Sequence, residues 1–283
     1  MTLHVKNTIS LNCRGKMIAS ESPLVMGILN VTPDSFHADS RARDISDAKY
    51  KVEQMIVQGA DIIDVGAVST RPHADEVSSE DEQSRLMPIL RVLVQEFPEA
   101  IFSVDTYREN IAEEALDVGA HIINDIRGGK NKVLMGLCAS ANAPYIAMHS
   151  KGTPQDMHLH THYSDLLAEM LQFFVHIKEE AIAIGLHDLI LDPGFGFAKT
   201  MEQNFLLLNH LEIFKILETP ILVGVSRKSM IYKPLLSTAD EVLSATSAVH
   251  MAALIGGAQI LRAHDVREAK EVISLYNLLQ SSH

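Results

Sequence analysis

Polar side chains that suit the binding of a flat ring follow several short apolar runs of the sequence. The runs "IFSVD", "HIINDI" and "DLILDPG" contain Asp105, Asn124 and Asp192 at their ends, and "PILVGVS" is followed by Lys228. A carboxylate accepts hydrogen bonds from paired N–H groups, a carboxamide donates and accepts, and an ammonium donates to a carbonyl oxygen. These residue types match the edges of a nitrogen-rich ring such as an amino-oxo pyrimidine.

Basic side chains near the end of the chain predict a site for an anion. "RAHD" contains Arg262 and His264, and Arg227 stands beside Lys228. The formal net charge of −12 would repel a polyanion, so an anionic ligand must be small and held by a local cluster. Asn30, after another apolar run, offers an oxygen for Mg²⁺, which commonly arrives with phosphates. We therefore expect a pterin-like ring deep in the site and a diphosphate toward its mouth.

The elements that must position these residues form a repeating pattern. Eight runs rich in Val, Ile and Leu start at residues 24, 61, 101, 121, 144, 188, 220 and 259. They are nearly continuous, as in parallel strands buried on both faces, and helical spacing occupies stretches such as 46–58, 108–118, 162–184, 202–217 and 239–256. The pattern predicts an α/β fold, a single (β/α)8 TIM barrel with its site at the carboxyl ends of the strands. We expect residues 1–20 to form a short N-terminal extension or cap, and residues 21–283 to form the barrel.

Glycine signals and composition agree with this fold. Gly59-Ala60, Gly119-Ala120 and Gly257-Ala258 each stand between a helical stretch and a strand, where glycine suits the left-handed end of a helix. Aromatic residues make up 5% of the 283 residues and Trp is absent, which argues against stacking surfaces for single-stranded nucleic acid. The two cysteines have no metal or redox spacing, and no signal peptide or membrane span is evident. We expect a cytoplasmic protein that binds neither nucleic acid nor membrane.

Eight sequence blocks in register extend over residues 26 to 265. They read "GILNVTPDSF", "GADIIDVGAVSTRP", "SVDT", "INDIRGG", "MHSKGTPQDM", "LDPGFGFAKT", "VSRKS" and "RAHD". In these blocks the chain resembles the dihydropteroate synthases. The resemblance implies a transferase of folate biosynthesis that condenses 6-hydroxymethyl-7,8-dihydropterin diphosphate with p-aminobenzoate, giving 7,8-dihydropteroate and pyrophosphate. It also implies Mg²⁺, a homodimer and a target of sulfonamides.

The resemblance assigns roles to residues by motif. The pterin would be held by Asp105, Asn124, Asp192 and Lys228, with Met148 against its face. The diphosphate and Mg²⁺ would be held by Asn30, Arg262 and His264, which with Lys228 form the catalytic set. The p-aminobenzoate site would comprise Thr70, Arg71, Pro72, Phe197, Lys228 and Ser229. The reaction needs mostly electrostatic stabilisation and no strong general base, because the aniline is already neutral at pH 7. "NVTPDSF" would act as a mobile lid over the leaving group.

Two loops depart from the family pattern. The family usually places Asp-Gly shortly after Phe36, where this chain has Ala38 and Asp39. In the second loop, Ala67 and Val68 replace the more frequent Gly-Glu, and His73 replaces Gly after Pro72. These changes leave open the loop geometry, the affinity for p-aminobenzoate and the response to sulfonamides.

Two other functions are compatible with parts of the pattern. A pterin-dependent methyltransferase shares the pterin-holding Asp and Asn residues, although its seventh-strand motif typically carries Ser-Asn where this chain has "SRKS". A non-catalytic paralogue that binds pterin without turnover would account for the altered loops, but would retain Asn30, Lys228, Arg262 and His264 without use.

Overall fold

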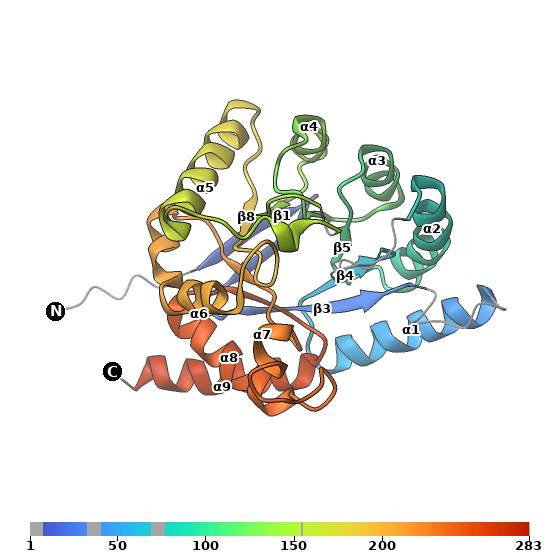
Figure 1. Ribbon diagram of the computed structural model, residues 1–283. Coiled ribbons are helices and arrows are strands. Elements are labelled where there is room, and N and C mark those ends of the chain that lie inside the picture. The colour runs from blue at the N-terminus through green and yellow to red at the C-terminus, as the bar shows by residue number, and fades with distance from the viewer. Residues whose placement is uncertain (1–7, 33–40, 69–76, 154, 283) are drawn as a thin grey trace.

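The computed structural model describes residues 8–32, 41–68, 77–153 and 155–282. Within them, eight parallel strands form a nearly closed barrel surrounded by helices (Figure 1). The strands are β3 (Leu24–Asn30), β4 (Ile62–Gly66), β5 (Phe102–Asp105), β6 (Ile122–Asp125), β7 (Tyr145–Met148), β8 (Leu189–Asp192), β9 (Leu222–Val223) and β10 (Ile260–Ala263). Their hydrogen-bonded order is β8-β7-β6-β5-β4-β3-β10-β9, and a parallel bridge between Leu191 and Ile221 joins the two ends of this sheet. The predicted α/β barrel is therefore confirmed.

The strands have the burial expected of a sheet covered on both faces. Every residue of β4, β5, β6, β7 and β8 is buried, in agreement with their nearly continuous apolar runs. The seventh strand is shorter than its run "PILVGVS" suggests, since only Leu222 and Val223 join the ladder. Pro220 has no N–H to donate at the start of this run, although its carbonyl oxygen accepts from the Leu191 N–H at 2.9 Å.

Helices cover the outside of the barrel. They are α1 (Arg41–Val57), α2 (Ser79–Glu96), α3 (Glu109–Val118), α4 (Lys132–Ala141), α5 (Leu166–Ala183), α6 (Met201–Asn209), α7 (Ser229–Tyr232), α8 (Leu243–Gly256) and α9 (Val266–Ser281), with 3₁₀ turns η2 (Met157–Leu159) and η3 (Leu211–Leu217). The predicted helix 202–217 is divided into α6 and η3, because His210 leaves the helical region at φ −122°. In the described part of the chain, no helix is long and apolar enough to cross a membrane.

The glycines predicted to end helices adopt the left-handed conformation. Gly59, Gly119 and Gly257 have φ values of 95°, 115° and 107°. The Gly119 N–H donates to Leu116 O, and the next residue, Ala120, donates to Ala115 O, so the last helical carbonyls are satisfied. Each of these glycines lets a helix end abruptly and the following strand begin within a few residues.

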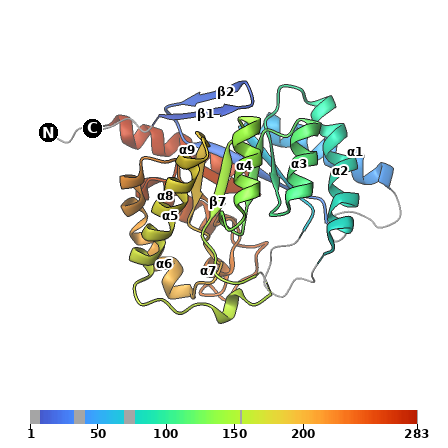
Figure 2. The same ribbon diagram turned by 90° about the horizontal axis from the view of Figure 1, so that it is seen from above.

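An antiparallel hairpin closes the amino-terminal end of the barrel. It consists of β1 (Ile9–Cys13) and β2 (Lys16–Ser20), and Figure 2 shows it lying across one end of the barrel. One face of β1 shares a buried cluster with the first residues of the barrel strands; the cluster contains Ile9, Leu11, Cys13, Leu24, Met26, Ile62, Ile122, Ile146, Ile190, Leu222 and Ile260. The Arg14 guanidinium donates to Ala120 O at 2.9 Å. The division of the chain at residue 20 stays a prediction.

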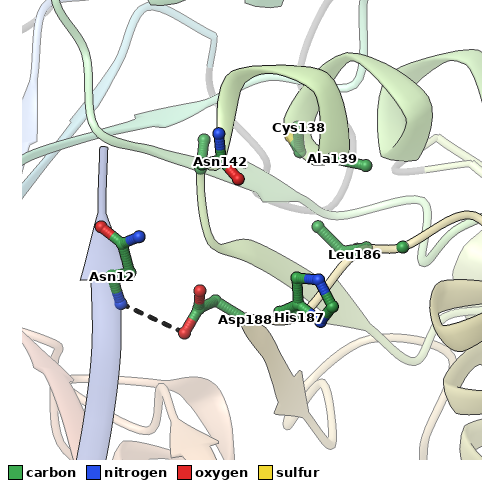
Figure 3. Close-up of a pocket in the computed structure, with 9 residues that line it drawn as sticks. Asn12, Cys138, Ala139, Asn142, Leu186, His187 and Asp188 are labelled. Atoms are coloured by element: carbon green, nitrogen blue, oxygen red, sulfur yellow. Dashed lines mark hydrogen bonds between the residues drawn. The ribbon is translucent and has the colours of Figure 1, made fainter. Parts of the chain in front are cut away.

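A cavity of about 220 Å³ lies beside this hairpin, away from the carboxyl ends of the strands (Figure 3). Its lining comprises Asn12, Cys138, Ala139, Asn142, Ala143, Gly185, Leu186, His187 and Asp188. The Asn12 N–H donates to Asp188 Oδ1 at 3.1 Å, so the cavity wall links the hairpin to the segment that precedes β8. This cavity contains none of the residues predicted to bind ligand.

We predict that the hairpin contributes strongly to the stability of the barrel. Leu11 is 1% exposed at the base of the barrel, so Leu11→Ala should lower the free energy of unfolding by about 2–5 kcal/mol. Met17, 61% exposed on the other strand of the hairpin, provides the control: Met17→Ala should change it by less than about 0.5 kcal/mol. Urea denaturation followed by circular dichroism measures both, and equal effects would contradict the prediction.

Candidate active site

Four polar side chains from four strands contact one another inside the barrel. Arg262 on β10 donates from Nε to Asp64 Oδ2 at 2.6 Å and from Nη2 to Asp105 Oδ2 at 2.9 Å. Asn124 on β6 donates from Nδ2 to the same Asp64 oxygen at 3.0 Å. Asp64, Asp105 and Asn124 are all buried. A single guanidinium thus links two carboxylates from β4 and β5 to the last strand of the barrel.

Burial controls the electrostatics of this network. Burial raises the pKa of Asp105 to about 7, while Arg262 opposes this rise and the neighbouring Asp64 carboxylate adds to it. The second oxygen of Asp64, Oδ1, is buried and has no hydrogen-bond partner within the described residues. A buried acceptor is costly when unsatisfied, so the network favours a ligand that brings N–H donors.

A second pair of opposite charges lies beside the network. Asp192 ends β8, where its Oδ1 accepts from the Gly194 N–H at 2.8 Å. Lys228 precedes α7, and its Nζ donates to Phe195 O and lies 4.6 Å from the centroid of the Phe197 ring. Burial lowers the pKa of Lys228 to about 8 against the attraction of Asp192, and burial raises the pKa of Asp192 against that of Lys228. Each charge therefore favours the charged form of the other.

An apolar cluster forms another part of the site. It contains Ile126, Met148, Met157, Phe197 and Ala198, with Tyr107 packed against it. Two loops approach the end of β7 so closely that a side chain would not fit: a Cβ on Gly128 would lie 2.1 Å from Met148 O, and one on Gly194 would lie 2.1 Å from His149 O. Glycine at both positions lets these loops close around Met148.

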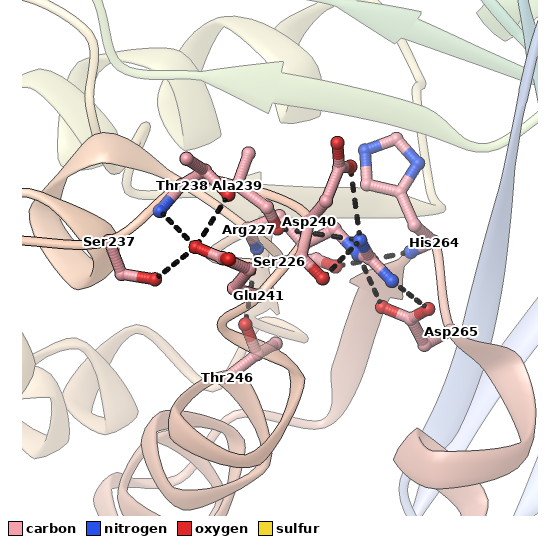
Figure 4. A network of polar contacts seen from close by, with 10 residues as sticks. All are labelled: Ser226, Arg227, Ser237, Thr238, Ala239, Asp240, Glu241, Thr246, His264 and Asp265. Atoms are coloured by element: carbon pink, nitrogen blue, oxygen red, sulfur yellow. Dashed lines mark hydrogen bonds and ion pairs between the residues drawn. The ribbon is translucent and has the colours of Figure 1, made fainter.

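Arg227 ties the loop after β9 to the end of β10 (Figure 4). Its Nε and Nη2 donate to the two carboxylate oxygens of Asp265 at 2.8 and 2.7 Å, and its Nη1 lies 3.4 Å from Asp240 Oδ1. The His264 N–H donates to Ser226 Oγ at 3.2 Å, and His264 is exposed. Contrary to the expectation that Arg227 serves an anion, its guanidinium is engaged in holding the loop that carries Lys228.

Comparisons with known proteins agree with this arrangement. A family model described as pterin binding enzyme matches residues 26–264. The chain is 41% identical over 267 residues to the dihydropteroate synthase of Escherichia coli (strain K12), covering 94% of each. The chain belongs to the dihydropteroate synthase family.

Solved structures of the synthase family have the same architecture. The Yersinia pestis dihydropteroate synthase with a sulfonamide drug complex superposes with a TM-score of 0.89 at 38% identity, covering 96% of this chain and 100% of that chain. The Xanthomonas albilineans dihydropteroate synthase with 4-aminobenzoic acid gives a TM-score of 0.89 at 32% identity, covering 97% and 99%. The resemblance inferred from the eight sequence blocks is therefore confirmed.

The structure describes only some of the residues assigned by the synthase motifs. Those described are Asn30, Asp105, Asn124, Met148, Asp192, Phe197, Lys228, Ser229, Arg262 and His264. Arg262 contacts Asp105 directly and is linked to Asn124 through Asp64, and Lys228 contacts the loop that contains Phe197. Thr70, Arg71 and Pro72 lie outside the described residues, as do Ala38, Asp39, His73 and residues 33–36 of the predicted lid. Ala67 is buried and Val68 is partly buried.

Asp64 is a site residue that the motif assignment omitted. It is the fourth residue of its apolar run "DIIDVG", as Asn124 is of "HIINDI". That position was the available signal, but it does not reveal that Asp64 accepts from both Asn124 and Arg262.

We predict that removing the central cation destabilises the fold in a pH-dependent manner. Arg262→Met would leave the buried carboxylates without their cation and lower the free energy of unfolding by about 3–5 kcal/mol at pH 8. Because the folded protein favours the protonated form of Asp105, the contribution of that carboxyl is present at low pH and lost as pH rises through about 7. The penalty of the substitution should therefore be smaller at pH 6 than at pH 8.

Urea denaturation at both pH values measures this effect. The control is Arg91→Met, which breaks a pair with Glu114 at 2.7 Å in which Arg91 is 58% exposed. It should cost less than about 1 kcal/mol at either pH. A penalty for Arg262→Met that is independent of pH would contradict the role given to Asp105.

Proposed function

We propose that this protein is a dihydropteroate synthase that condenses 6-hydroxymethyl-7,8-dihydropterin diphosphate with p-aminobenzoate. The observation that carries this proposal is the group formed by the buried Asp105, Asn124 and Asp192 and the partly buried Lys228 at the carboxyl ends of the barrel strands, near Met148. These side chains offer the acceptors and donors that match the edges of a pterin. Membership of the synthase family supports the same assignment.

In the proposed complex the pterin lies against Met148, and its N–H groups are bound by buried carboxylates. Asp105 and Asp192 accept from the ring, Asn124 pairs with ring nitrogen and is oriented by Asp64, and Lys228 donates to the ring carbonyl oxygen. Asp64 thus supports pterin binding through its contacts with Asn124 and Arg262.

The reaction exchanges a C–O bond for a C–N bond. The bond between the pterin methylene carbon and the diphosphate oxygen breaks, and its electron pair leaves with pyrophosphate. The aniline nitrogen of p-aminobenzoate then bonds to that carbon and loses a proton. The buried carboxylates favour positive charge on the pterin, while Arg262 and His264 hold the departing anion.

Mg²⁺ fits the residues at this end of the barrel. Asn30 ends β3 and is partly buried, and the described residues contain no group of three or more His, Cys, Asp or Glu side chains that would hold a metal by itself. A single amide oxygen suits Mg²⁺, which keeps several waters and binds together with substrate phosphates. We propose that Asn30 holds Mg²⁺ with the diphosphate, where the ion would act as a Lewis acid toward the leaving group.

The site for p-aminobenzoate is proposed beside Lys228. Phe197, within 4.6 Å of Lys228 Nζ, offers a ring face, and Ser229 begins α7 next to it. Thr70, Arg71 and Pro72 are proposed to complete the site, and sulfonamides are proposed to compete for it.

We further propose a cytoplasmic homodimer. The packed elements α6, η3 and α8 expose apolar side chains, among them Phe205 at 41%, Ile216 at 76% and Ile255 at 62%, which a second copy would cover. Cys13 and Cys138 are both free and buried, in keeping with a reducing compartment.

The decisive experiment measures pyrophosphate release by the purified protein with Mg²⁺ and dihydropterin diphosphate, with and without p-aminobenzoate. We expect release that depends on p-aminobenzoate, with dihydropteroate identified by mass. Pterin binding without this product would instead identify the non-catalytic paralogue that the altered loops suggest. Methyl transfer from a methylated pterin to a corrinoid would favour the methyltransferase.

We predict that Lys228→Ala impairs both pterin binding and turnover. The substitution removes the ammonium beside Asp192 and the donor to Phe195 O, so the rate should fall by about a hundredfold or more. The matched control is Lys233→Ala, because Lys233 is exposed just beyond α7. Titration with 6-hydroxymethylpterin and steady-state assays measure both effects, and unchanged turnover in Lys228→Ala would refute the assignment.

A further inference from the structure

The loop between β8 and α6, residues 193–200, has a conformation that is costly to hold. Gly194, Gly196 and Ala198 adopt positive φ values of 67°, 79° and 49°. Ala198 carries a Cβ, so the left-handed conformation is unfavourable there. The loop also contains Phe197, the ring proposed to contact p-aminobenzoate. Other contacts must therefore fix the backbone of this loop and with it the Phe197 ring.

Lys199 supplies the central contacts. Its Nζ donates to Gly194 O and Phe197 O, both at 3.1 Å, and lies 3.4 Å from His149 O. The same Nζ lies 3.1 Å from Nδ1 of His149. One ammonium therefore joins two carbonyl groups of the loop to the residue that follows β7.

The position of this ammonium is energetically demanding. Lys199 is 8% exposed, and burial lowers its pKa to about 7 against the attraction of Asp192. Burial lowers the pKa of His149 to about 2, so its ring is neutral and Nδ1 is able to accept from Lys199. A buried cation is costly unless it is hydrogen-bonded, and the acceptors around Lys199 all belong to the protein. We infer that the site requires the loop geometry that these hydrogen bonds fix.

Other side chains hold the rest of the same loop. The Tyr163 hydroxyl donates to Ala198 O at 3.0 Å, and Asn204 Oδ1 accepts from the Gly196 N–H at 2.7 Å. Lys228 Nζ donates to Phe195 O, so the loop also locates the ammonium proposed to bind both substrates. The two loop carbonyl groups bound by Lys199 are interspersed along the loop with the groups bound by these side chains, and one of the two belongs to Phe197.

We propose that Lys199 is a positioning residue for the p-aminobenzoate site, because its ammonium fixes residues 193–200 so that the Phe197 ring and Lys228 lie together. This inference rests on the proposed synthase function. Lys199 itself contacts His149 and the loop rather than the reacting atoms. Asp105 and Asn124 come from strands that Lys199 does not hold, so the pterin site depends on it less.

The test compares Lys199→Met with the wild-type protein. Methionine retains apolar volume but leaves the carbonyl groups of the loop without their donor. We expect the KM for p-aminobenzoate to rise about ten- to a hundredfold, since misplacing a positioning group by about 1 Å has effects of this size. The KM for the pterin diphosphate should rise by a smaller factor, because both substrates share Lys228 but Lys199 does not hold Asp105 or Asn124.

Lys178→Met is the matched control. Lys178 also donates from Nζ to a backbone carbonyl, Leu217 O, but it lies on α5 away from the strand ends. This variant should show lower thermal stability at most, with both KM values unchanged. Equal effects of Lys199→Met on the two KM values, or no effect on either, would overturn the proposal.

Hydrogen–deuterium exchange gives a readout that does not require turnover. The amides of residues 194–200 should exchange at least about tenfold faster in Lys199→Met than in Lys178→Met. If the wild-type protein makes no dihydropteroate, the proposed function fails, while exchange still tests the role of Lys199 in holding the loop. Unchanged exchange in this segment would refute that role whatever the activity.

A milder variant covers the case in which Lys199→Met does not fold. Lys199→Gln keeps two N–H donors on a side chain shorter by one bond. It should raise the KM for p-aminobenzoate by about three- to tenfold and increase exchange in residues 194–200. Wild-type values for both quantities would refute the proposal.

Discussion

The pairing of Arg262 with Asp64 and Asp105 is the interaction on which the site depends. It joins the last barrel strand to the second and third, so these charges meet only when β10 lies against β3 and the barrel is formed. Each member would be costly alone at such burial, and together they satisfy most of one another's hydrogen-bonding capacity. The polar site and the closure of the barrel are therefore consequences of the same contacts.

The amino-terminal end of the barrel contributes to stability, whereas the carboxyl-terminal end carries the proposed site. At the amino-terminal end, Leu11 and its neighbours in the hairpin form an apolar cluster with the first residues of the strands. At the carboxyl end, the strands finish in polar side chains whose burial opposes folding unless each is paired. Burial of this apolar cluster stabilises the fold and offsets the cost of burying charged groups at the opposite end.

The sequence predicted the strands and their polar ends because parallel strands leave a strong, nearly continuous apolar signal. It did not predict which of these polar side chains contact one another. Asn124 and Asp125 are adjacent, but Asn124 contacts Asp64 in the barrel, whereas Asp125 accepts from the Tyr145 hydroxyl and the Gly129 N–H. Pairing of this kind depends on the register between strands and on loop conformation. For the same reason Arg227 looked like an anion ligand in the sequence, and Lys199 gave no signal at all.

Charge balance at the mouth of the barrel explains how an acidic protein suits an anionic substrate. The chain has a formal net charge of −12, yet the strand ends and the loops beside them bring three buried carboxylates together with three cations, one buried and two partly buried. These are Asp64, Asp105, Asp192, Lys199, Lys228 and Arg262. Near neutrality in this region removes the local repulsion that the overall charge would impose. Because each cation already has a carboxylate or carbonyl partner, a diphosphate bound as proposed would have to compete with internal acceptors for Arg262. The site therefore gains selectivity from pairing, since only a ligand that also satisfies the released carboxylates recovers the full interaction.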